Sequence, residues 1–111
     1  MTVEASMSVH RHKIWVDDMR IPPDDSYDIA RTYDEAVDLL SKNQYTDIYL
    51  DHDLGDVGNP NRREMTGYDV LLFLVDRKNA GKYVPMNFHI LTANPVGRDK
   101  FVGVINRYLS S

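Results

Sequence analysis

Aspartates gather at two points of this chain, and each group directly follows a short apolar run. Asp17-Asp18 ends the run 13–16, and Asp51 ends the run 47–50. Short runs of this kind are typical of strands in a parallel sheet, where ligands bind at the carboxyl ends of the strands. Carboxylates gathered at one edge repel each other unless a cation joins them, and hard oxygen ligands favour Mg²⁺. The sequence therefore predicts that Asp17, Asp18 and Asp51 hold a magnesium ion.

Polar side chains after a later apolar run are expected to add phosphate-binding groups to this site. Thr92 and Asn94 follow the run 87–91, and Arg98 lies at the start of the last expected helix. A hydroxyl, an amide and a guanidinium can each donate to phosphate oxygens, and a helix N-terminus offsets residual negative charge. Thr92 and Asn94 are equally well explained as a cap or turn ahead of a helix.

Two residues beside Asp51 are candidates for proton transfer. His52 follows Asp51, so its side chain is expected to leave the strand on the other side. A histidine at an edge lined by carboxylates can act as a general acid or base. Asp53 is the second candidate, unless it only supports the turn, and His52 has an equally good alternative as a packing residue under the segment 54–65. His89 lies inside its run and is interpreted as a half-buried packing residue.

Alternating strands and helices must position these side chains. The predicted strands are 13–16, 27–31, 47–50 and 87–91, and the predicted helices begin after Thr32, after Thr66 and near Val96 and extend to about residues 42, 79 and 109. This order implies a parallel sheet with helices on its faces. The connection 18–27 contains two prolines and is too short for a helix, so it is either an extended loop or leads into an irregular edge strand. The segment 54–65 is predicted to be a long loop of the lid or binding type.

Composition bounds the remaining possibilities. A chain of 111 residues makes one domain, which we expect at 12–111 after a flexible tail at 1–11. The net charge of −4 and the absence of a basic run argue against an extended nucleic-acid surface. The chain has no cysteine, no apolar stretch that approaches a membrane span and no apolar signal core, so we expect a cytoplasmic protein without disulfides or a membrane anchor.

The acidic pair, Asp51 and Thr92 together resemble the site of a two-component receiver domain. Four ordered motifs are more similar to a receiver-like family, the cyclic-phosphate-processing receiver domains; they span residues 15–23, 50–55, 66–69 and 93–98. The resemblance implies a small α/β, flavodoxin-like, three-layer sandwich with a mainly parallel four-stranded sheet. The expected sheet lacks the final strand of a receiver domain, which carries the receiver's lysine. Leu91 stands where the family often has histidine.

The resemblance implies a function as well: metal-dependent hydrolysis of a small cyclic phosphate, on a nucleotide or an RNA-repair product. In that scheme Asp17, Asp18 and Asp51 hold Mg²⁺, and the residues after the fourth strand bind phosphate. A covalent variant makes Asp51 the nucleophile. The alternative is a non-catalytic receiver-like binding protein that recognises a protein partner or sequesters a nucleotide, and a phosphoacceptor in signalling ranks last.

Overall fold

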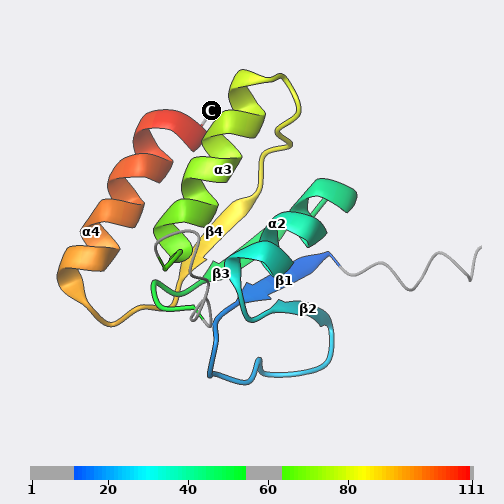
Figure 1. Cartoon of the computed structure of the whole chain (residues 1–111), viewed down its shortest axis with the longest axis vertical. Coiled ribbons are helices and arrows are strands. Elements are labelled where there is room, and N and C mark those ends of the chain that lie inside the picture. The colour runs from blue at the N-terminus through cyan, green and yellow to red at the C-terminus, as the bar shows by residue number, and fades with distance from the viewer. Residues whose placement is uncertain (1–11, 55–63, 111) are drawn as a thin grey trace, which may run out of the picture.

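The described part of the molecule is built on one parallel sheet. The computed structural model describes residues 12–54 and 64–110, and within them four strands pair in the order β2-β1-β3-β4 (Figure 1). The strands are β1 (Lys13–Val16), β2 (Tyr27–Ala30), β3 (Asp47–Leu50) and β4 (Asn87–Ile90), so β2 and β4 end one residue earlier than predicted. The last residues of the four strands are paired with one another in the register, so all four strands end at the same edge of the sheet.

The helices begin where the capping signals predict them. They are α2 (Tyr33–Lys42), α3 (Gly67–Asn79) and α4 (Pro95–Val104), and a π-helical turn (Ile105–Leu109) prolongs α4. The Thr32 hydroxyl accepts the backbone N–H of Glu35 at 3.1 Å, and the Asp69 carboxylate accepts that of Thr66 at 2.8 Å. These caps satisfy backbone groups that the first turn of a helix leaves unpaired.

All described helices cover the same face of the sheet. One buried cluster joins alternate residues of the strands, such as Ile14 and Leu50, to residues of α2, α3 and α4. The α/β receiver-like fold with a parallel sheet is therefore confirmed. The third layer expected on the opposite face has no helix within residues 12–54 and 64–110. That face instead carries an aromatic row, in which Tyr49 stacks on His89 with ring centroids 4.1 Å apart and on Trp15 at 5.6 Å.

The connection from β1 to β2 is an extended loop, the first of the two predicted alternatives. β2 pairs regularly with β1 along its whole length, so it is not an irregular strand. The carbonyl of Arg20 fastens the loop, because it accepts the Trp15 indole N–H at 3.2 Å and the Arg31 guanidinium at 2.7 Å. The predicted tail 1–11 and most of the predicted loop 54–65 lie outside the described residues. No helix in the described ranges is long and apolar enough to cross a membrane.

Candidate metal and phosphate site

Asp17 and Asp51 stand side by side because their strands are neighbours. The hydrogen-bond ladder continues past the strand ends: Asp17 N–H donates to the Ala30 carbonyl at 3.1 Å, and Asp51 N–H to the Val16 carbonyl at 2.9 Å. With Asp18, these residues each offer one carboxylate oxygen, and the three atoms lie within 4.8 Å of one another. The sequence prediction of an acidic cluster at the carboxyl edge of the sheet therefore matches the geometry.

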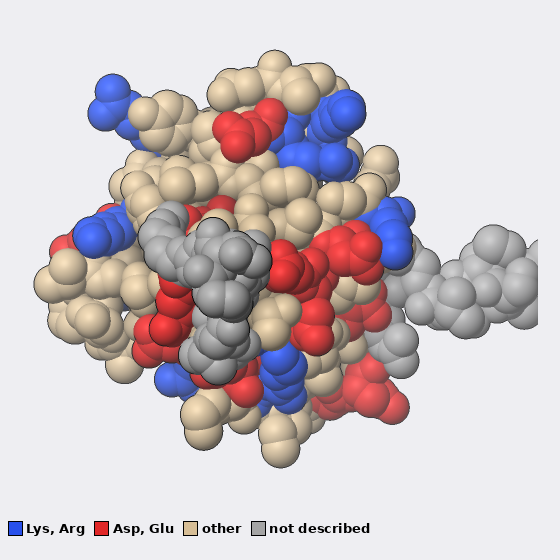
Figure 2. All heavy atoms as spheres, in the orientation of Figure 1, with Lys and Arg blue, Asp and Glu red and all other residues tan. Residues whose placement is uncertain are grey.

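The cluster opens into a hollow of about 380 Å³. Its lining comes from the ends of β1 and β3 and comprises Asp17, Asp18, Met19, Arg20, Asp51 and Asp53. Figure 2 shows Asp and Glu side chains gathered around the middle of the face that looks towards the viewer. This is a surface that attracts cations, because several carboxylates share one concave region.

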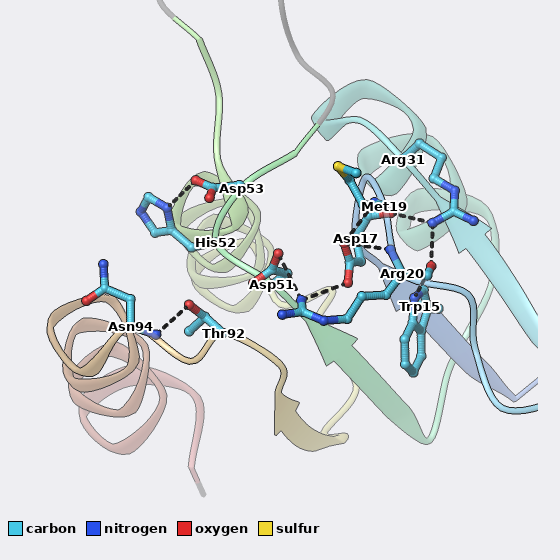
Figure 3. A network of polar contacts seen from close by, with 10 residues as sticks. All are labelled: Trp15, Asp17, Met19, Arg20, Arg31, Asp51, His52, Asp53, Thr92 and Asn94. Atoms are coloured by element: carbon cyan, nitrogen blue, oxygen red, sulfur yellow. Dashed lines mark hydrogen bonds and ion pairs between the residues drawn. The ribbon is translucent and has the colours of Figure 1, made fainter.

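Arg20 is a part of this site that the sequence analysis did not assign. Its guanidinium Nη1 lies 3.1 Å from Asp17 Oδ2 and 3.3 Å from Asp51 Oδ2 (Figure 3). The other Asp17 oxygen, Oδ1, accepts the backbone N–H groups of Met19 at 3.0 Å and Arg20 at 3.3 Å. In the sequence, Arg20 lies within the motif 15–23 and three residues after Asp17, and neither feature indicates that its side chain also reaches Asp51.

Electrostatics of the pair favour a cation between the carboxylates. Burial raises the pKa of Asp51 above its ordinary value, and the charge of Asp17 raises it further, while the His52 backbone N–H and the Arg20 cation lower it. The Asp17 hydrogen bond and the charge of Asp51 raise the pKa of Arg20. Asp51 thus sits where a negative charge is costly unless a positive group accompanies it.

The side chains of His52 and Asp53 contact each other, and they differ in whether they reach the hollow beside the acidic pair. The His52 ring lies on the side of α4, where it stacks near Phe101 with centroids 5.9 Å apart, so it leaves the strand opposite to Asp51 as expected (Figure 3). His52 Nδ1 lies 3.2 Å from Asp53 Oδ1, and the Asp53 side chain is 84% exposed. Of these two candidates for proton transfer, only Asp53 lines the hollow. His89 is half-buried, and its Nε2 lies 2.9 Å from Asp47 Oδ1. This placement agrees with the interpretation of His89 as a half-buried packing residue.

Thr92, Asn94 and Arg98 lie beyond the lining of the hollow, at the start of α4. Thr92 Oγ1 accepts the Asn94 backbone N–H at 3.2 Å, and Asn94 Oδ1 caps α4 by accepting the Val96 N–H at 3.0 Å. Arg98 Nη1 reaches the Ile90 carbonyl at 3.5 Å. The cap or turn explanation therefore applies to Thr92 and Asn94. Those two bonds leave the Thr92 hydroxyl hydrogen and the Asn94 amide nitrogen as donors.

A parallel sheet of this order, with carboxylates after its first and third strands, defines a receiver-like domain. The family model of the cyclic-phosphate processing receiver domain matches residues 12–107, so the chain belongs to that family. No curated protein and no solved structure matches the chain.

Proposed function

We propose that this protein is a Mg²⁺-dependent phosphoesterase that opens a small cyclic phosphate, carried by a nucleotide or an RNA-repair product. Membership of a family associated with cyclic-phosphate processing supports the substrate class. The observation that carries the proposal is the approach of Asp17, Asp18 and Asp51, whose carboxylate oxygens lie within 4.8 Å of one another. This all-oxygen donor set fits a hard divalent cation, since such ions are held by one to three carboxylates and by phosphate oxygens.

The proposed roles follow from the elements that bear each residue. Asp17, Asp18 and Asp51 would hold Mg²⁺, which when bound would polarise a phosphoryl oxygen and offset its charge. Donors at the start of α4, from Thr92, Asn94 and Arg98, would bind the other phosphate oxygens. The N-terminus of that helix adds partial positive charge. The substrate would thus lie between the ends of β1 and β3 and the start of α4.

In the proposed reaction the oxygen of a water molecule bonds to phosphorus while one P–O bond of the ring breaks. The proton that leaves the water passes to Asp53 or His52, and the ester oxygen released from phosphorus takes up a proton, which leaves a phosphate monoester. Asp53 has the better approach of the two, because it borders the hollow with an exposed carboxylate. His52 is the second choice, because its ring packs towards Phe101 of α4 and does not line the hollow.

The second candidate function is a non-catalytic receiver-like binding protein, which would recognise a protein partner or sequester a nucleotide. The contacts of Arg20 favour this alternative, because Asp17 and Asp51 already have a cationic partner without a metal ion. A binding protein of that kind does not require a metal ion to replace Arg20 beside the two carboxylates. The two candidates differ in whether Mg²⁺ and Asp51 are required for a chemical change.

The test is ³¹P NMR with Mg²⁺ and a panel of cyclic-phosphate nucleotides and ADP-ribose cyclic phosphate. Wild type and Asp38→Asn should convert a member of the panel to a monoester, whereas Asp51→Asn and wild type with a chelator should not. Asp38 is the matched control, because it is an exposed carboxylate on α2, it pairs with Lys42 at 2.9 Å and it does not line the hollow. Unchanged spectra from folded wild type with bound metal would contradict the phosphoesterase and favour the binding protein.

A further inference from the structure

A single guanidinium nitrogen occupies the point between the two carboxylates. Arg20 Nη1 contacts Oδ2 of Asp17 at 3.1 Å and Oδ2 of Asp51 at 3.3 Å. Asp17 is completely buried, and its Oδ1 is engaged by two backbone N–H groups, so Oδ2 is the oxygen that it offers to a cation. A metal ion and this nitrogen would therefore need the same oxygen atom of Asp17, and both would lie beside the carboxylate of Asp51.

The backbone of Arg20 is fixed, whereas its side chain is half-exposed. The carbonyl accepts two hydrogen bonds, from Trp15 and Arg31, and the N–H donates to Asp17. The side chain is 49% exposed and lies at the border of the hollow. Rotation about the side-chain torsions can thus carry the guanidinium from the carboxylates to water while the loop from β1 to β2 stays in place.

We propose that Arg20 is a built-in counter-ion, which neutralises Asp17 and Asp51 in the metal-free protein and is displaced when a divalent cation binds. The inference rests on the metal site of the proposed function, but it does not depend on hydrolysis. Arg20 keeps the buried carboxylates paired, because an isolated charge in a buried position is costly. It also lowers the apparent affinity for Mg²⁺, since the ion must first break two charge-assisted contacts.

Competition predicts a gain of affinity when the arginine is removed. Arg20→Gln should bind Mg²⁺ roughly tenfold more tightly than wild type in calorimetric titration without substrate, about the factor that one hydrogen-bonded charge pair contributes. Lys42→Gln is the matched control, because it removes the same charge from an exposed pair with Asp38 on α2. It corrects for the general effect of net charge on cation binding.

Thermal unfolding provides a second measurement that remains informative if Arg20→Gln is unstable without metal. Mg²⁺ should raise the melting temperature of Arg20→Gln more than that of wild type, because the ion replaces a missing counter-ion. Affinity of Arg20→Gln equal to or below that of Lys42→Gln would overturn the inference, and would mean that Arg20 supports the metal-bound state. Absence of binding by all variants would overturn the metal site itself. Tighter binding without hydrolysis of any cyclic phosphate would refute only the proposed reaction.

Discussion

Gly67 is the position where the fold and the acidic edge depend on each other most directly. It begins α3, and its N–H donates to the His52 carbonyl at 2.8 Å. A Cβ built on Gly67 would lie 1.9 Å from the Asp51 carbonyl oxygen and 3.1 Å from Cζ of Phe101. Gly81 is the one glycine with positive φ among the described residues, so the constraint at Gly67 is steric and not conformational.

Gly67→Ala should therefore destabilise the protein by forcing α3 away from the backbone of Asp51. The new methyl group and the carbonyl oxygen must separate by about 1 Å to reach the shortest contact that real Cβ atoms make. Such overpacking costs about 1–3 kcal/mol, and weakening the bond to His52 adds about 1 kcal/mol. We expect a loss of about 2–4 kcal/mol in the free energy of unfolding, which lowers the melting temperature by roughly 10–20 °C.

The assay is urea unfolding followed by circular dichroism, with Gly103→Ala as the matched control. Gly103 lies in α4 with nothing within 4 Å of its Cβ position. Alanine there should stabilise the protein by about 0.5–1 kcal/mol, since it restricts the unfolded chain and favours the helix. Gly67→Ala should also weaken Mg²⁺ binding, because relief of this clash displaces the backbone of Asp51 as well as α3. A stability of Gly67→Ala within about 0.5 kcal/mol of wild type would refute the close approach of α3 to Asp51.

Two further changes test the charge cluster and the core. Asp51→Asn should stabilise the metal-free protein at neutral pH, because burial raises the pKa of Asp51 above its ordinary value of 3.8. The folded state then holds this proton more tightly than the unfolded chain, so wild type loses stability as the pH rises from 3.8 through the raised pKa, and the advantage of Asp51→Asn should grow over that interval. Unfolding curves in chelator at several pH values measure it, and an advantage that stays constant with pH would contradict the cause. Leu74→Ala should lower the free energy of unfolding by about 2–5 kcal/mol in the same assay, since Leu74 is 3% exposed on the side of α3 that faces the core. A negligible loss would mean that this face of α3 is not packed.

Local signals were enough to predict the elements and the acidic edge. Thr32 and Thr66 mark the starts of two helices because their caps involve residues only three positions away. The four strands follow from short apolar runs, whose ends fall within one residue of the prediction. The sequence alone predicts that Asp17 and Asp51 lie close together, because parallel strands end at the same edge of a sheet.

The partners of individual side chains were decided by tertiary structure. The sequence could not predict that the helices cover one face, because strands with aromatic residues at alternate positions suit either a covered face or an open one. It could not predict that His52 packs towards Phe101, which lies in α4, far along the chain. Nor could it predict that Arg20 reaches Asp51, since this contact requires β1 beside β3 and a loop held by Trp15 and Arg31. Spacing along the chain determines which residue types reach the edge of the sheet, whereas strand order and loop anchoring determine which of their atoms meet.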